Sequence, residues 1–356
     1  MPNRFVIPAR ATGATATLRR LMASERPGIR DVARAAGVSR TTVSHALNGK
    51  GRVAEETRER ILAVAERLGY RPNTNALHLT QRRTGLLALA SSPSDPVPLG
   101  LLDADYFLAL APAASEAALR AGYALVLGPS GGSTELWSQI ELDGALITDP
   151  LPSDPFLREL ERRGTPYVTL GRDVDRREET WWVDSDLEAA TISALDHMEA
   201  AGARRIGFVA EPPRHSYSID ELHAYESWQA ARGGRPLVEE AGGNHTEAGF
   251  HAALRLLDAP DRPDAIVTTL EGLALGVKLA AEARALRMPE ELMIASVSDG
   301  PGLAQAHTSI TAVDLAPAEI GAAAVRLLID RLEGRSTAPA QVQVPSTLRP
   351  RASTRR

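Results

Sequence analysis

The chain has 356 residues, 44% of them apolar and 24% charged, an ordinary composition for a folded protein of two or three domains. The lack of cysteine excludes disulfides, thiolate zinc sites, iron–sulfur clusters and a cysteine nucleophile. No apolar run is long enough to span a bilayer and no secretory signal is recognisable, so we expect a cytoplasmic protein without a membrane partner. The net charge of −5, taken alone, argues against a nucleic-acid partner.

That charge is distributed unevenly along the chain. Residues 1–83 hold 16 Arg and Lys against 6 Asp and Glu, a net charge of +10, whereas the rest hold 24 against 39, a net charge of −15. A basic segment joined to an acidic body is typical of a nucleic-acid-binding module attached to a separate domain. Ordinary variation of surface charge along a chain is the alternative.

Residues 1–26 are rich in Ala, Thr and Arg and show no apolar periodicity, which predicts a disordered arm. Met1 and Met22 both remain as possible starts of translation. Three short helical patterns follow, one around Val32, one over residues 39–48 and one over residues 54–68. Gly37 supplies the tight turn between the first two, so the pattern predicts a helix-turn-helix.

From residue 85 onward, apolar strand-like runs alternate with amphipathic helices. Strands are predicted at residues 86–90, 124–127, 144–148, 167–170, 205–209, 265–267 and 293–297. Helices are predicted at residues 108–121, 155–163, 186–201, 246–257, 273–286 and 316–332. This alternation indicates parallel sheets covered by helices, and its length indicates two α/β subdomains.

The helix-turn-helix carries a family pattern. Residues 29–73 resemble the DNA-binding head of the lactose/galactose repressor family, whose D-V-A-x-x-A-G-V-S-x-x-T-V-S begins here at Asp31. The resemblance implies an all-α helix-turn-helix head, over residues 27–72, that binds operator DNA. It also implies an α/β core built like a periplasmic binding protein from two parallel-sheet subdomains.

The resemblance places the base-reading pair at Arg40 and Thr41, which open the recognition helix. His45 replaces the arginine usual in the family, and histidine is shorter and nearly neutral at pH 7. Contacts to the DNA backbone, or capping of the helix, fall on Ser39, Thr42, Ser44, Asn48, Tyr70 and Asn73. For Tyr70 a place in the core of the head is the alternative.

Residues 73–83 match the family's hinge helix, which becomes ordered on operator DNA. Leu79 stands where a leucine wedges into the minor groove and bends the DNA. Ala76, one turn earlier, is small enough to let two hinge helices meet in a homodimer. The resemblance therefore implies a palindromic operator that is bound by two chains.

Residues 84–354 resemble the family's effector-binding core. The resemblance implies an N-subdomain of residues 84–184 and 312–335, and a C-subdomain of residues 185–311 and 336–354. The chain would cross between them near Asp184, Thr311 and Ser336. A small-molecule effector, a sugar or another metabolite, would bind between the subdomains, and no cofactor is implied.

Candidate effector residues are taken over position by position: Tyr106, Phe107, Arg172, Asp184, Trp228, Leu270, Glu271, Ser298 and Asp299. For Arg172 a bridge between the subdomains is the alternative, and for the three aromatic residues packing in the core is the alternative. Three positions depart from the family pattern. Ala224 replaces an arginine, Leu270-Glu271 replaces Asn-Asp, and Ser298 replaces the first of two aspartates. The departures predict either a less hydroxylated effector than a sugar or the loss of the ligand.

Two other functions compete with this reading. Ser130 lies in a G-x-S-x-G sequence directly after a predicted strand, the position of the nucleophile in an α/β hydrolase. No recognisable His or Asp accompanies it, so the sequence favours a regulator over an enzyme. An exported solute-binding protein would need a signal segment and no head. Whether the effector induces or co-represses stays open.

Overall fold

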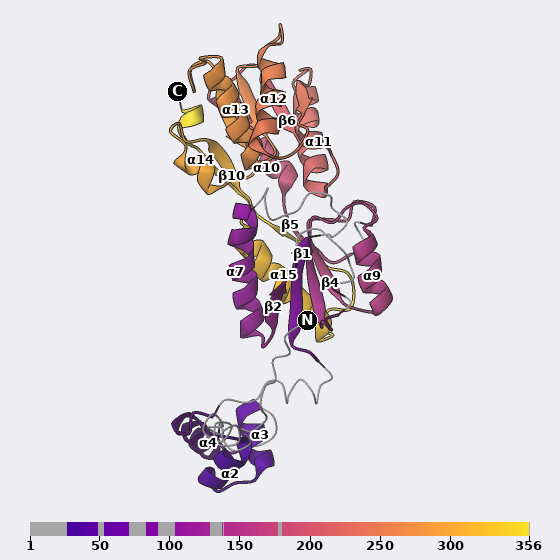
Figure 1. The fold of residues 1–356 in the computed structure, drawn as a ribbon, viewed down its shortest axis with the longest axis vertical. Coiled ribbons are helices and arrows are strands. Elements are labelled where there is room, and N and C mark those ends of the chain that lie inside the picture. The colour runs from indigo at the N-terminus through magenta and orange to yellow at the C-terminus, as the bar shows by residue number, and fades with distance from the viewer. Residues whose placement is uncertain are drawn as a thin grey trace, which may run out of the picture. The chain divides into compact units, whose positions relative to one another are not determined.

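The computed structural model describes residues 27–48, 53–70, 83–91, 104–128, 137, 139–176 and 180–355. The chain divides into two compact units, Met1–Gln81 and Arg82–Arg356, which we call the head and the body (Figure 1). The expected arm lies outside the described residues, as do Asn73, Ala76, Leu79 and Ser130. What the sequence predicts for them stays a prediction.

The described part of the head consists of three helices, α2 (Ile29–Ala36), α3 (Arg40–Asn48) and α4 (Glu55–Arg67). Gly37 follows α2 with φ 67°, a left-handed conformation that glycine adopts without strain, and it turns the chain toward α3. One apolar cluster joins the three helices; its buried members are Val32, Ala33, Ala36, Val43, Ala46, Ile61, Val64 and Ala65. The three helices predicted from the sequence are confirmed.

The body contains two six-stranded sheets. The first has the order β11-β5-β4-β3-β1-β2, with parallel strands throughout. Its strands are β1 (Leu86–Ser91), β2 (Ala124–Leu127), β3 (Gly144–Thr148), β4 (Tyr167–Leu170), β5 (Trp182–Ser185) and β11 (Gln341–Val344).

Among the described residues, helices cover both faces of the first sheet (Figure 1). They are α7 (Ala104–Arg120), α9 (Pro155–Arg163) and α15 (Pro317–Leu332). Leu87 and Leu89 of β1 join the apolar cluster with α7 and α15, whereas Ala88 and Ala90 join the cluster with α9. Successive residues of β1 therefore face opposite sides of the sheet, as expected of a strand buried on both faces.

The second sheet has the order β12-β10-β9-β8-β6-β7, and only β12 runs antiparallel to its neighbour β10 among these pairs. Its strands are β6 (Ile206–Ala210), β7 (Val238–Glu240), β8 (Ala265–Thr268), β9 (Met293–Ser296), β10 (Thr311–Asp314) and β12 (Thr347–Arg349). The two predicted α/β subdomains are thus confirmed.

Helices cover both faces of the second sheet. Helices α10 (Leu187–Ala200) and α11 (Ser216–Ala231) share one apolar cluster with it, and α12 (Thr246–Leu257) and α13 (Glu271–Ala283) share another. Two short helices complete the fold, α14 (Pro301–Gln305) and the 3₁₀ helix η1 (Ala352–Thr354).

The three passages between the sheets follow β5, β10 and β11. The first lies next to Asp184, as predicted. The second follows Asp314, so the predicted boundary at Thr311 is three residues early, because residues 312–314 still pair within the second sheet. The prediction of the third near Ser336 is wrong, because β11 still pairs with β5 of the first sheet. Val344 is buried in the apolar cluster of that sheet, and the chain crosses between β11 and β12.

Candidate DNA-binding and effector sites

The recognition helix α3 has one buried and one exposed side. Val43 is fully buried in the core of the head, whereas Arg40 and Thr41 are exposed on the first turn. A guanidinium in this position can bind the O6 and N7 atoms of guanine in a major groove. The two residues predicted to read bases are therefore accessible to DNA.

Ser39 and Thr42 begin this helix. Thr42 donates its backbone N–H to Ser39 Oγ over 3.1 Å, and the two hydroxyl oxygens lie 2.8 Å apart in a second hydrogen bond. The side chain of Ser39 thus satisfies an N–H group that the helix itself leaves unpaired. The structure places both residues in a helix cap, and contacts with phosphate would be additional.

The other predicted DNA contacts lie farther along the head. Ser44 and His45 are half-buried on α3, and Asn48 is the last residue of that helix. Tyr70 packs against the apolar core of the head, and burial raises the pKa of its phenol. The alternative role of Tyr70 in the core is therefore consistent with its packing.

In the body, polar side chains are buried where parallel strands of both sheets end. Ser91 and Thr148 end β1 and β3 of the first sheet, and Thr269 and Ser298 follow β8 and β9 of the second. Ligands of open α/β sheets bind at the carboxyl ends of the strands. The body therefore carries the polar lining of a ligand site at these ends.

The centre of this polar region is Arg172, which follows β4 and is 8% exposed. Gly171 precedes it with φ 87°, and a Cβ atom there would lie 2.8 Å from Asp149 Oδ1. The glycine thus permits the turn that brings Arg172 between the two sheets. Arg172 donates its backbone N–H to Ser216 Oγ of α11 over 3.0 Å.

Two carboxylates surround the guanidinium of Arg172. Its Nε lies 3.8 Å from Asp184 Oδ2 of β5, and Asp220 of α11 forms a second ion pair with it. The guanidinium also lies 5.6 Å from the centre of the Trp182 ring. We call Arg172, Trp182, Asp184, Ser216 and Asp220 the Arg172 cluster. It joins elements of the first sheet to α11 of the second.

Burial changes the acidity of Asp184. Loss of water around its carboxyl raises the pKa to about 7, while Arg172 and the backbone N–H of Ser185 act in the opposite direction. Because burial disfavours the charged form, the protonated and ionised forms are both populated near neutral pH.

A pH dependence of stability follows. The pKa of Asp184 is raised in the folded state, so its protonation stabilises the fold at low pH and this contribution disappears as the pH rises from about 4 to about 7. We expect Asp184→Asn to flatten the fall in unfolding free energy over this range, by roughly 4 kcal/mol at most. Urea denaturation at a series of pH values measures this. Parallel curves for the two proteins would contradict it.

A second part of the site is a hollow of about 330 Å³ beside the first turns of α7. It brings together the predicted Tyr106, Ser298 and Asp299, along with Asp105. Asp299 is held in a two-pronged ion pair with Arg351, with both N–O distances 2.7 Å. We call this hollow the α7 pocket.

Glu271 lies beside the α7 pocket, and its carboxylate is held by backbone groups of a neighbouring helix. Its carboxylate accepts hydrogen bonds from the backbone N–H groups of Gly302 and Leu303, in the first turn of α14. Burial raises the pKa of this carboxyl, and the negative charge of Asp105 adds to the shift. The close approach requires Gly300, because a Cβ there would overlap the carboxylate of Glu271.

The remaining three predicted effector residues lie in apolar clusters. Phe107 packs against the core of the first sheet, and Leu270 is buried under α12 and α13. Trp228 donates its indole N–H to Asp196 over 2.7 Å, and the Arg232 guanidinium lies 3.8 Å from its ring centre. These contacts give the three residues packing roles outside the Arg172 cluster and the α7 pocket.

Sequence reasoning missed Ser216 and Asp220, which contact Arg172, and the neighbouring Glu211, His215 and Tyr217. Tyr217 donates its hydroxyl to Glu211, and its ring stacks on that of His215 at 5.4 Å. Only their place in the chain could have indicated a role in ligand binding. Glu211 directly follows the carboxyl end of β6, and the others lie at or near the start of the next helix, α11.

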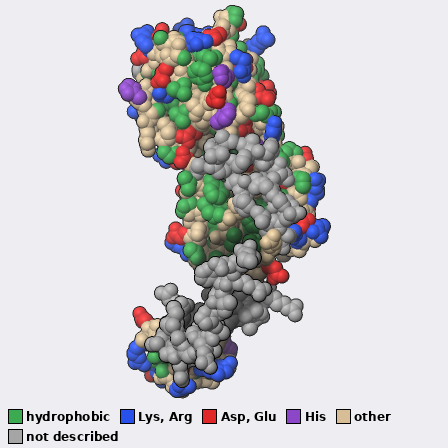
Figure 2. Space-filling view, viewed as in Figure 1, with side chains coloured by type: hydrophobic (Ala, Val, Ile, Leu, Met, Phe, Trp, Pro, Cys, Tyr) green, Lys and Arg blue, Asp and Glu red, His purple; other side chains and the backbone are tan. Residues whose placement is uncertain are grey.

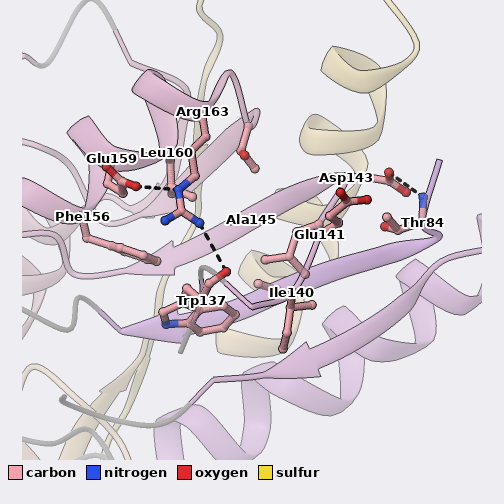
Figure 3. A pocket seen from close by; sticks show the side chains of 13 residues that line it. Thr84, Trp137, Ile140, Glu141, Asp143, Ala145, Phe156, Glu159, Leu160 and Arg163 are labelled. Atoms are coloured by element: carbon pink, nitrogen blue, oxygen red, sulfur yellow. Dashed lines mark hydrogen bonds and ion pairs between the residues drawn. The ribbon is translucent and has the colours of Figure 1, made fainter. Parts of the chain in front are cut away.

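A further hollow of about 330 Å³ lies near the amino ends of β1 and β3 (Figure 3). Three of the charged residues that line it form contacts within the body. Glu159 pairs with Arg163, and Asp143 accepts hydrogen bonds from the backbone N–H groups of Thr84 and Gly85. Asp143 thus fixes the chain where it enters the first sheet. The hollow lies at the opposite strand ends from the Arg172 cluster.

Helix α7 also carries an exposed apolar surface. Leu108 is 65% and Leu119 64% exposed, and their spacing of three helical turns puts them on one side of α7. Leu127 of the adjoining edge strand β2 is exposed as well. Hydrophobic side chains gather on the surface over α7 (Figure 2). We call Leu108, Leu119 and Leu127 the α7 surface.

Comparisons with known proteins follow the same division of the chain. The model of bacterial regulatory proteins of the lacI family matches residues 28–73, and that of a periplasmic binding protein-like domain matches residues 195–354. The HTH-type transcriptional regulator CelR of Thermobifida fusca is 30% identical over 344 residues, which cover 92% of this chain and 98% of CelR. The chain belongs to the lacI family. The resemblance inferred from the head is confirmed.

Solved structures agree with this lacI-family assignment. A complex of the regulator CelR with cellobiose is 27% identical, covers 92% of this chain and 100% of its own, and gives a TM-score of 0.69. A lac repressor dimer bound to operator and an anti-inducer gives a TM-score of 0.71 at 22% identity, over 93% of this chain and 100% of its own. The latter supports the fold, and the predicted fold class is confirmed.

None of the helices in the described ranges has the length and apolar character needed to cross a membrane. Nor does that part of the chain gather three or more His, Cys, Asp or Glu side chains in an arrangement that could hold a metal ion.

Proposed function

We propose that this protein is a transcriptional regulator that binds a palindromic operator as a homodimer, and that a small molecule bound between the two sheets of the body controls this binding. The observation that carries the proposal is the helix-turn-helix with Arg40 and Thr41 exposed on α3. A regulator acts where the chromosome is, so we propose a cytoplasmic location. The family comparison and the lac repressor dimer on its operator support the proposal.

Selection of bound sequences from random duplex DNA tests this function. Two recognition helices related by a two-fold axis predict a palindrome whose half-sites lie a whole number of helical turns apart. The hinge, with Leu79 as the expected wedge, further predicts a flexible step at the centre of the palindrome. Recovery of sequences without a palindrome would contradict the proposal.

We assign the α7 surface to the dimer interface. Exposed leucines that lie together are typical of protein contacts, and a two-fold axis would bring both copies of this surface together. Leu119→Glu is therefore expected to weaken dimerisation at least about tenfold, since it places a charge in an apolar contact. Sedimentation velocity over a range of concentrations measures the change.

The matched control for this dimer prediction is Ile140→Glu. Ile140 is also an exposed apolar residue of the body, but it lies in the hollow near the amino ends of the strands. The control variant is expected to sediment as the native dimer. Equal effects of the two substitutions would show that α7 is not the interface.

For the body we propose the binding of an effector and no catalysis. The named relatives are regulators, and the CelR structure contains cellobiose. Arg172 and Asp184, with Asp220, would contact the effector on one side, and Tyr106, Ser298 and Asp299 on the other. Covalent labelling of Ser130 by a fluorophosphonate probe would revive the hydrolase alternative.

A further inference from the structure

The strand ends around the Arg172 cluster carry an excess of negative charge. Asp149 follows β3, Asp184 belongs to β5, and Glu211 follows β6. Asp220 and Glu221 lie in the second turn of α11, and Glu221 is only 1% exposed. These five carboxylates lie near the same strand ends as the guanidinium of Arg172, which pairs with Asp184 and Asp220. An anionic ligand would be repelled here.

The guanidinium groups nearby already bind carboxylates. Arg172 is paired with Asp184 and Asp220, and Arg351 of the α7 pocket is paired with Asp299. A phosphate or carboxylate ligand would have to displace these acids before it could bind an arginine. The pairing therefore removes the usual means of binding an anion.

Hydrogen-bond acceptors remain available at the same place. Asp184 Oδ2 is buried, faces Arg172 Nε at 3.8 Å, and receives no hydrogen bond from any described residue. The buried hydroxyl groups of Ser91, Thr148 and Thr269 also make no hydrogen bond within the described residues. Buried polar groups in folded proteins are nearly always satisfied, so these atoms indicate a polar ligand. Asp184 Oδ2 is an acceptor, and it indicates that this ligand donates a hydrogen bond there.

We propose that the effector is an amino sugar, whose protonated amine binds among the carboxylates around Asp184. The inference rests on the proposed function, because it assigns a chemical class to the effector of that same site. It replaces the expectation of an effector less hydroxylated than a sugar, which rested only on the departures from the family pattern. An ammonium group compensates the negative charge and donates three hydrogen bonds. The hydroxyl groups of the ring find partners in Ser91, Thr148 and Thr269, which both donate and accept.

Three disaccharides with one skeleton test the role of the amine. They are the β-1,4-linked glucosamine disaccharide, its di-N-acetyl derivative and cellobiose, which carry an ammonium, a neutral amide and a hydroxyl at the same position. Isothermal titration of the full chain is done at neutral pH, where Asp184 is partly ionised and the amines are partly protonated. We expect the glucosamine disaccharide to bind at least about tenfold more tightly than the other two, a difference of about 1.4 kcal/mol.

The variant Asp184→Asn identifies the carboxylate responsible. Asparagine resembles the protonated form of Asp184, so we expect the variant to fold and to lose most of the preference for the amine. Asp258→Asn is the matched control, because Asp258 pairs with Arg284 on the exposed surface of α12 and α13. It removes the same charge and is expected to keep the preference.

Three results would overturn the amino-sugar proposal: cellobiose binding as tightly as the amine, the acetylated sugar doing so, or none of the three sugars binding. Should Asp184→Asn fail to fold, the comparison of the amine with its acetylated form on the native chain still decides. Operator binding by the ligand-free chain is measured on the same preparation. Because the effector can induce or co-repress, the measurement is repeated with each sugar. Loss of operator binding under every one of these conditions counts against the regulatory function, whereas operator binding without a preference for the amine counts against the amino-sugar proposal alone.

Discussion

Arg40→Ala is expected to weaken operator binding by about thirtyfold to twenty-thousandfold. Each arginine that forks onto a guanine contributes about 1–3 kcal/mol of discrimination, and a dimer loses two such contacts. Arg40 is exposed on the first turn of α3 and lies outside the apolar core of the head, so the substitution removes no packing. The loss of affinity should therefore come without a loss of stability.

Titration of the variant against the selected operator, and against variants at each base pair, measures the effect. Base preference should relax at one pair of symmetry-related positions and stay unchanged elsewhere. Arg67→Ala is the matched control, since it removes the same charge from an exposed position at the end of α4. If both variants lose affinity equally and without change of base preference, Arg40 contributes only general electrostatic attraction.

The fold of the head could be predicted because its determinants are local. Ser39 caps the helix that follows it. Val43 and Leu47 are spaced one helical turn apart and both pack into the core of the head. The helical pattern of apolar residues on α3 also predicts that Arg40 and Thr41 are exposed. Each of these features depends on residues within a few positions of one another.

The body was predicted less completely, and α11 shows why. Its buried residues include Ser216, Ser218 and Glu221 as well as Tyr225 and Trp228, so no apolar stripe marks the helix. Edge strands such as β7 and β11 are short and partly polar, and their pairing depends on distant chain segments. For the same reason the position of the third passage between the sheets was misjudged.

The site was predicted in part. Arg172 and Asp184 were found through the family resemblance, and the structure brings them together. Asp220 was missed because it meets Arg172 only through the packing of α11 from the second sheet against the end of β4 from the first. The family pattern makes Trp228 a candidate effector residue with core packing as the alternative, and in the structure its indole binds Asp196 and lies against Arg232. Aromatic character alone does not separate a ligand contact from packing.

Removal of the Arg172 guanidinium is expected to have the largest effect on stability. Arg172→Leu leaves Asp184 and Asp220 without their buried positive partner, and the loss of one partner from a buried ion pair costs about 3–5 kcal/mol. It also removes the side-chain contact that joins the end of β4 to α11. Denaturation of the variant in urea measures the loss, which we expect to be larger at pH 8 than at pH 5.5.

The sign of this pH dependence follows from Asp184. Arg172 lowers the pKa of that carboxyl, so its removal raises the pKa further above 7 and makes ionisation of Asp184 in the folded state more costly. Protonation at low pH relieves the uncompensated charge, and the double variant Arg172→Leu, Asp184→Asn should relieve it at every pH. We therefore expect the second substitution to restore part of the stability, most of all at pH 8. A double variant no more stable than Arg172→Leu at pH 8 would show that the contacts of Arg172 with α11, and not its charge, stabilise the body.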